Sequence, residues 1–262
     1  MPLGYDRRLA LLALEPGAGA DTASVLLDAL AHARDVAAVG ADAVAVLLDP
    51  VLAAELAPVA MTRGLSVVLE VDDRDQERFV LADGDGFAGP IEDLDPTLTA
   101  ARVRWHPDDA PEVKKAQALG LTRLAAWLHE TDRSLLLELV APRDRTQDAL
   151  REIRELGIDA DVWSVPPPVD AADAARLGAL LRDEGRDRVS ALVRIGSVDH
   201  AEDVLRATAA VDAYRGVVFG PDLWSDELGA AAVDDGSREA AARRIGDRFA
   251  HIIDLSTAAP SA

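Results

Sequence analysis

The chain contains no cysteine, so disulfide bonds, thiolate nucleophiles and cysteine-ligated zinc or iron–sulfur sites are excluded. Aromatic residues make up only 4% of its 262 residues, and the only lysines are Lys114 and Lys115. No apolar run reaches the roughly 20 residues that span a bilayer, and the N-terminal MPLGYDRR has no stretch typical of a signal peptide. These absences favour a cytoplasmic protein that does not contact membranes.

Positive charge is also scarce, because 27 lysines and arginines face 47 acidic residues and leave a net charge of −20. Such a field repels nucleic acid, so we expect no nucleic-acid partner. A diffuse negative surface also serves solubility and does not identify a partner. Of the five histidines only His106 directly follows an expected strand, so we expect no metal site and no cofactor.

Apolar runs of strand length alternate with amphipathic stretches of helix length, which predicts βα units and a parallel sheet. The expected helices include 22–39, 51–63, 112–129 and 170–182. Eight such units closing on themselves form a single α/β domain, the (β/α)₈ TIM barrel. The expected strands are 9–14, 43–48, 66–71, 101–105, 135–140, 161–165, 189–195 and 216–219.

Two segments depart from the minimal pattern. The polar, glycine-rich stretch 72–96 after the third strand is too long for an ordinary βα connection. It is expected either to cover the catalytic face as a lid or to pack as an irregular excursion. An extra C-terminal helix is expected at 237–253, after a short one at 223–232. We therefore assign 1–255 to the barrel and 256–262 to a flexible tail.

Barrel enzymes carry their chemistry where the strands end, and these positions are unusually polar here. Any one such residue has about even odds of being only a helix cap or a solvated turn, and Asp49, Asp170 and Asp222 suit caps best. The ligand-binding candidates are Glu15, Asp49, Arg104, Arg143, Ser164, Arg194, Gly196, Ser197 and Gly220, and the catalytic candidates are Glu138 and His106.

Glu138 interrupts the apolar run LLLELV, where an unpaired carboxylate would be costly to bury. We expect it to face the barrel interior beside an arginine, Arg104 or Arg143. Arg102 and Arg104 alternate on one strand and so point to the same side. An Arg–Glu pair that merely fills the barrel centre is the structural alternative, and a lone histidine such as His106 is more often structural than functional.

Gly196-Ser197 and Gly220 end the last two strands, where barrels often hold a phosphate with backbone N–H groups. The signal is weak, because a glycine after a strand is commonly just a tight turn. Pro221 also removes one donor, and Asp222 would repel a phosphate.

The segments DPTLTAARVRWHPDD, LAAWLHETDRSLLLELVAPRD, DVWSVPPPVD and RGVVFGPDLW together resemble the tagatose-bisphosphate-type class I aldolases. The likeness is greatest to the aldolase-like domain fused behind the sugar kinase of inositol catabolism, and it runs through most of the chain. The positions that match are Asp49, Arg104, the His106-Pro107 turn, Glu138 and Gly220. Glu15 stands where the family usually has Asp.

The resemblance implies a Schiff-base lysine on the sixth strand, yet Ser164 occupies that position, and a hydroxyl cannot form an imine. Asp72-Asp73 replaces a Glu-Lys pair of the family, and Ala100 replaces a lysine on the fourth strand. Pro221 replaces an arginine after the eighth strand. These losses argue against a bisphosphate substrate.

We therefore expect an aldolase-like barrel that binds a small ligand of sugar or keto-acid type, non-catalytic or divergent, and that could form a homo-oligomer. The alternative is an active lyase or isomerase that uses acid–base or metal chemistry without an imine.

Overall fold

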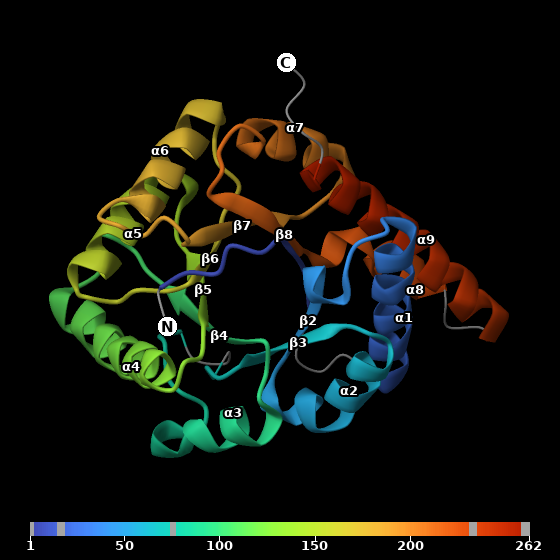
Figure 1. The fold of residues 1–262 in the computed structure, drawn as a ribbon, viewed down its shortest axis with the longest axis horizontal. Coiled ribbons are helices and arrows are strands. Elements are labelled where there is room, and N and C mark those ends of the chain that lie inside the picture. Colours follow the sequence, from blue (N-terminus) through green and yellow to red (C-terminus); the bar gives the residue numbers. More distant parts are fainter. Residues whose placement is uncertain (1–2, 15–18, 74–76, 231–234, 258–262) are drawn as a thin grey trace.

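The computed structural model describes residues 3–14, 19–73, 77–230 and 235–257. Eight parallel strands close into a barrel in chain order, so β8 pairs with β1, and helices surround the barrel (Figure 1). This is the expected TIM-barrel fold. The strands are β1 (Leu9–Ala13), β2 (Val44–Leu48), β3 (Ser66–Glu70), β4 (Leu98–Arg104), β5 (Leu135–Val140), β6 (Val162–Val165), β7 (Ser190–Ile195) and β8 (Tyr214–Phe219).

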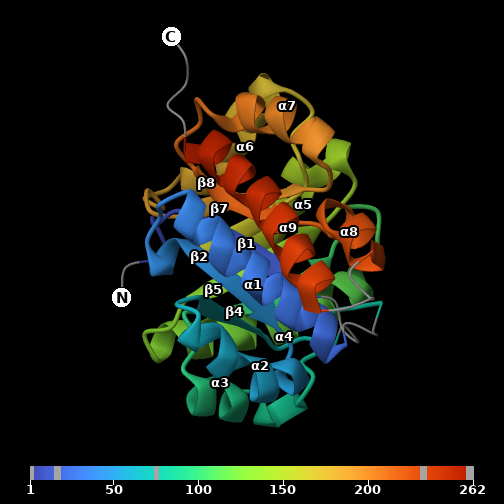
Figure 2. The ribbon, with the colours of Figure 1, turned by 90° about the vertical axis from the view of Figure 1, so that its right-hand side faces the viewer.

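Each strand is followed by helical structure. The extra C-terminal helix α9 lies alongside α1, across the outside of the barrel (Figure 2). Among the described residues, no helix is long and apolar enough to cross a membrane. The helices are α1 (Ala20–Val36), α2 (Pro50–Thr62), α3 (Ala88–Leu94), α4 (Pro111–Glu130), α5 (Thr146–Glu155), α6 (Ala171–Arg182), α7 (Val198–Thr208), α8 (Ser225–Ala230) and α9 (Asp235–Thr257).

The boundaries differ from the expected ones at a few ends. Strand β4 begins at Leu98 rather than Ala101, because Leu98 and Ala100 pack inside the barrel. Helix α9 runs to Thr257, so it includes two residues that we had assigned to the flexible tail. The rest of that tail, 258–262, lies outside the described residues.

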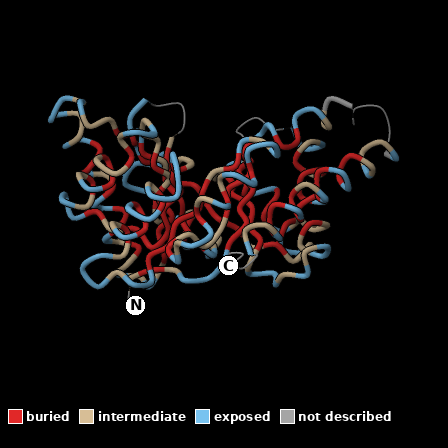
Figure 3. The backbone as a smooth tube through the Cα atoms, turned by 90° about the horizontal axis from the view of Figure 1, so that it is seen from above, coloured by how far each residue is buried: buried red, intermediate tan, exposed pale blue. Residues whose placement is uncertain are grey.

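Side chains alternate between two apolar cores along every strand. On β5, Leu136 belongs to a small cluster on the barrel axis, whereas Leu135, Leu137 and Leu139 pack against the helices. Because both faces are covered, the strands read as nearly continuous apolar runs, and Figure 3 shows the buried residues filling the centre of the molecule. The same alternation places Glu138, two residues after Leu136, on the inner face.

The long segment after β3 is an excursion that packs on the outside of the barrel. Asp72 forms an antiparallel bridge with Leu81, and Phe79 and Phe87 are buried in the outer core. The buried Gln117 side chain of α4 accepts a hydrogen bond from the Phe79 N–H at 2.9 Å and donates one to the Arg104 carbonyl at 3.1 Å. The excursion is therefore tied to the end of β4; residues 74–76 lie outside the described part.

Asp161, just before β6, joins three parts of the chain near the N-terminal ends of the strands. Its buried carboxylate accepts hydrogen bonds from the Gly4 N–H at 2.7 Å and the Leu135 N–H at 2.8 Å. The His129 Nε2 at the end of α4 lies 3.2 Å from the same carboxylate. The N-terminal segment, α4 and the start of β5 are thus held by one acidic side chain.

This cluster shifts the pKa of both ionisable groups. Burial alone raises the pKa of Asp161, but the hydrogen bonds from His129, Gly4 and Leu135 outweigh it and lower the pKa below its ordinary value. The hydrogen bond to Asp161 raises the pKa of His129, against the opposing effect of burial. The histidine therefore stabilises the fold in its protonated form.

The cluster predicts a pH-dependent stability. The contribution of His129 is complete below its ordinary pKa of 6.5 and is lost as the pH rises through its higher folded pKa. The contribution of Asp161 is complete above its ordinary pKa of 3.8 and is lost as the pH falls through its lower folded pKa. Thermal unfolding should show that His129→Gln flattens the decline in stability above pH 6.5 relative to the wild type.

His251→Gln is the matched control, because His251 lies on the exposed side of α9 and no partner is found for it among the described residues. An equal flattening in both variants would contradict the role of the Asp161 cluster.

Gly216 lies where the barrel closes, opposite Leu9 of β1 and Leu192 of β7. A Cβ at this position would lie 1.8 Å from the Leu9 carbonyl oxygen. This atom belongs to the backbone, so the clash can be relieved only by shifting strand β1. We predict that Gly216→Ala lowers the free energy of unfolding by about 3 kcal/mol. Chemical denaturation measures this, with Gly89→Ala as the control, because a Cβ at Gly89 meets nothing within 4 Å. Equal losses of unfolding free energy in the two variants would show that closure of the barrel does not require a glycine at position 216.

Candidate functional site

The inner face of the barrel carries a polar layer at the C-terminal ends of β3 to β7. It consists of Glu70, Arg102, Glu138, Ser164 and Arg194. Arg102, Glu138 and Ser164 are neighbours in register on β4, β5 and β6. Each lies two residues beyond an apolar residue on the barrel axis. Because residues two apart in a strand point to the same face, all five side chains point inward. This layer is the geometric centre of the candidate site.

Glu138 faces the interior, as we expected, but its partner is Arg194 rather than Arg104 or Arg143. The Arg194 Nη2 donates a hydrogen bond to the Glu138 Oε1. The Glu138 side chain is 14% exposed and that of Arg194 is 32% exposed, so the pair is open to the mouth. The guanidinium of Arg194 neutralises the Glu138 carboxylate, which would be costly to bury unpaired within an apolar strand.

Arg143 has a different role from the one we expected. Its Nε donates to the Pro167 carbonyl at 3.0 Å, and its Nη2 donates to the Pro168 carbonyl at 2.7 Å. The guanidinium therefore braces the triproline loop that follows β6. A ligand could use this side chain only by competing with these two carbonyl oxygens.

Arg104 and His106 continue the inner side of β4 toward solvent. Arg104 is exposed, and its guanidinium has no partner among the described residues. The His106 Nδ1 accepts a hydrogen bond from the Asp108 N–H at 3.2 Å, and its side chain is 45% exposed. With Nδ1 used as an acceptor, the proton of a neutral ring resides on Nε2, which can then donate to a ligand.

Several other expected ligand residues already have partners within the protein. The Gly220 N–H donates to the Ile195 carbonyl at 2.9 Å, and the Ser197 hydroxyl lies 2.8 Å from the His200 Nδ1. Asp49 caps α2 by accepting from the Leu52 N–H at 2.8 Å, which confirms its expected capping role.

Of the other two expected helix caps, the structure shows one. Asp170 likewise caps α6, whereas Asp222 lies within the 3₁₀ turn Pro221–Leu223 and does not cap it. A Cβ on Gly196 would meet no atom within 4 Å, so this turn is open. Glu15 lies outside the described residues.

Three interior polar residues were not among the expected site residues, namely Glu70, Asp72 and Arg102. Glu70 is only 2% exposed, and the buried Asp72 carboxylate accepts the Arg102 N–H at 2.7 Å. Their strand-end positions are visible in the sequence, but without the register nothing separates them from ordinary loop residues. Glu70 and Arg102 belong to the polar layer, and Asp72 lies next to it through its hydrogen bond from the Arg102 N–H.

The two lysines lie on the outer side of the molecule. The Lys114 Nζ contacts Glu152 of α5 at 2.7 Å, and the indole Nε1 of Trp105, which points outward from β4, donates to the same carboxylate at 3.0 Å. Lys115 is exposed on α4. Neither amine faces the barrel interior. In the part of the chain that the structure describes, no three histidine or acidic side chains are placed to hold a metal ion.

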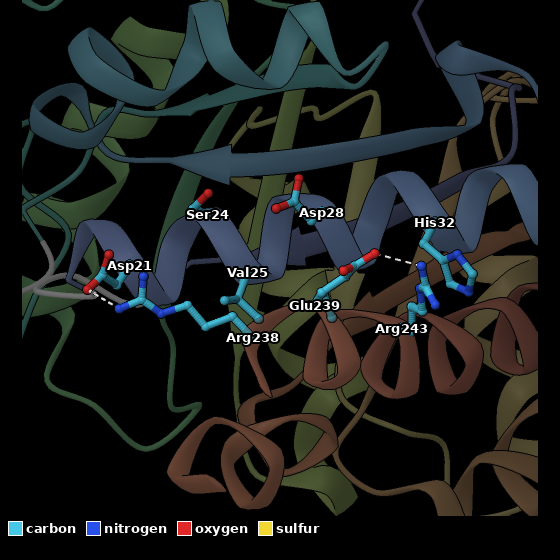
Figure 4. A pocket seen from close by; sticks show the side chains of 9 residues that line it. Asp21, Ser24, Val25, Asp28, His32, Arg238, Glu239 and Arg243 are labelled. Carbon is cyan, nitrogen blue, oxygen red and sulfur yellow. Dashed lines mark hydrogen bonds and ion pairs between the residues drawn. The ribbon is translucent and has the colours of Figure 1, made fainter. Parts of the chain in front are cut away.

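A cavity of about 430 Å³ lies away from the strand ends, between α1 and α9 (Figure 4). Four of its charged side chains bond to one another: Arg238 contacts Asp21 at 3.0 Å, and Arg243 contacts Glu239 at 2.6 Å. Because these groups neutralise each other at the surface, this cavity is a weaker candidate than the strand ends.

The fold is similar to that of known aldolases. One solved structure, fructose-bisphosphate aldolase from Plasmodium falciparum in complex with TRAP and a small-molecule inhibitor, has a TM-score of 0.66 and 11% identity, over 97% of this chain and 91% of that one. A second protein, described as a fructose-1,6-biphosphate aldolase from Coccidioides immitis, has a TM-score of 0.59 and 12% identity, over 96% of this chain and 93% of that one. At such low identity these likenesses show the fold alone.

No curated protein matches the sequence. The family described as "Uncharacterized protein conserved in bacteria (DUF2090)" matches residues 1–259. The chain, which folds as an aldolase-like TIM barrel, therefore belongs to this family.

Proposed function

We propose that this protein binds a small ligand of sugar or keto-acid type at the C-terminal ends of its strands, without Schiff-base chemistry. The observation that carries the proposal is the identity and setting of residue 164. Ser164 lies on the inner face of β6, in register with Glu138, where the resemblance to the tagatose-bisphosphate-type aldolases places the reactive lysine. A serine hydroxyl cannot supply the electron sink that an imine provides.

The charges at the mouth support a ligand with at most one strongly anionic group. Arg104 and Arg194 retain unused donors toward the mouth, whereas Arg102 already has a partner and Arg143 is held by two proline carbonyls. The Gly220 N–H, which could have helped to bind a phosphate, is used within the barrel. Two phosphates would require more positive charge and more donors than these groups supply.

A second function, that of a lyase or isomerase using acid–base chemistry, has one observation in its favour. Glu138 combines a mostly buried carboxylate with an opening to the mouth and a neighbouring guanidinium. A carboxylate placed in this way can accept a proton from a bound ligand, and the exposed His106 ring can donate one. The proposed binding site is the same in both cases, and only the fate of the ligand differs.

We predict that no imine forms. Borohydride treatment in the presence of dihydroxyacetone phosphate or a ketohexose bisphosphate should leave the protein mass unchanged, because neither lysine faces the barrel interior. Mass spectrometry of the intact chain checks this. A substrate-sized increment that disappears in the Lys114→Arg, Lys115→Arg double variant would refute the proposal.

We also predict that affinity does not rise with phosphate count. In calorimetric titrations, a sugar bisphosphate should bind no more than about threefold tighter than a sugar monophosphate, because Arg102 and Arg143 are already engaged within the protein and too few free basic side chains remain for a second phosphate. Inorganic phosphate provides the reference. Binding that tightens strongly and steadily from phosphate to bisphosphate would show that backbone donors alone form a phosphate site.

A further inference from the structure

The Glu138–Arg194 ion pair crosses the inner face of strand β6. Strand β6 lies between β5 and β7 in the barrel, and Ser164 is in register with Glu138 on one side and Leu192 on the other. Arg194 lies two residues beyond Leu192, so its side chain must reach across β6 to contact Glu138. The pair therefore lies across the inner face of β6 at Ser164. A ligand that enters from the C-terminal ends of the strands would contact it.

This ion pair leaves most of its hydrogen-bonding capacity unused. A guanidinium has five N–H donors, and among the described residues Arg194 makes a single contact, to one carboxylate oxygen. The second oxygen of Glu138 has no partner in the same part of the chain. The opening to the mouth leaves these unused groups within reach of a ligand.

Two further groups beside the pair also lack partners among the described residues. The Ser164 hydroxyl lies in the same layer, and the side chain is 3% exposed. The Arg104 guanidinium belongs to the inner side of β4, one step nearer to solvent than the layer of Glu138. Unused donors and an unused carboxylate oxygen thus occur on neighbouring strands of the same inner face.

We propose, building on the sugar-type ligand of the proposed function, that the ligand is a sugar acid and that this pair recognises its 2-hydroxycarboxylate group. Its carboxylate accepts hydrogen bonds from the free N–H donors of Arg194, and its adjacent hydroxyl donates to the free oxygen of Glu138. A donor next to an acceptor on the protein requires an acceptor next to a donor on the ligand. A 2-ketocarboxylate fits less well, because its keto oxygen would face the Glu138 carboxylate without a proton between them.

The discriminating experiment compares lactate and pyruvate, which differ at the second carbon by a hydroxyl and a ketone. Ligand-observed NMR at millimolar concentration measures the binding of D-lactate, L-lactate and pyruvate to the full chain. The wild type should prefer one lactate enantiomer to pyruvate by about tenfold, because a site built around a ligand hydroxyl rejects an analogue that lacks it.

Two variants separate the roles of the pair. Glu138→Gln retains an oxygen that can accept from Arg194 but adds an N–H that can donate to a ketone, so the preference should vanish or reverse toward pyruvate. Arg194→Gln should weaken the binding of both ligands by at least about tenfold, because it removes the charged donor. Arg206→Gln on α7, which removes an exposed arginine bonded to Asp203, should leave binding unchanged.

Each outcome has a definite meaning. A wild type that binds neither ligand, or binds both equally, overturns this inference. A lactate preference that survives unchanged in Glu138→Gln, or binding that is insensitive to Arg194→Gln, also overturns it. Trapping of an imine by borohydride would refute the proposed function instead, so failure of the one is distinguishable from failure of the other. Thermal unfolding of each variant establishes that a loss of binding is not a loss of fold.

Discussion

Closure of the sheet onto itself governs which side chains of this protein can meet. Because β8 pairs with β1, one face of the sheet is enclosed, and the pleat of each strand sends successive side chains alternately to the barrel axis and to the helices. On β6 this alternation sends Trp163 into the outer core and Ser164 to the interior. A residue can therefore face a ligand in the barrel interior only if it lies on the inward-pointing side of its strand, whatever the chemistry of its side chain.

Much of this arrangement can be predicted from the sequence. Eight apolar runs separated by helical periodicity are sufficient to expect the barrel, and a carboxylate within LLLELV is sufficient to expect an inward-facing, paired Glu138. The identity of the partner could not be predicted, because Arg194 reaches it across an intervening strand. Sequence spacing locates the backbone positions but does not show how far a long side chain extends.

The role of Arg143 could not be predicted from the sequence either, because its partners are backbone carbonyls rather than a ligand or an acidic side chain. Three consecutive prolines lack N–H groups but retain carbonyl oxygens, and two of these oxygens bind the guanidinium. A residue type that suits an anion is therefore also suited to bracing a loop. In the polar layer, Arg194 and Arg102 are therefore the arginines that face inward, with Arg104 one step nearer to solvent.

The buried amide of Gln117 has a consequence for how this fold can vary in length. One side chain connects Phe79 in the excursion to the carbonyl of Arg104 at the end of β4. A residue gained or lost between the Asp72–Leu81 bridge and Phe79 would misalign the amide and leave a buried polar group without a partner. The exposed stretch 83–86 makes no buried polar contact of this kind, and its contact with α4 is the exposed Arg123–Asp85 ion pair. Relatives of this chain that differ in loop size should therefore accommodate the difference there, and leave the approach to the mouth unchanged.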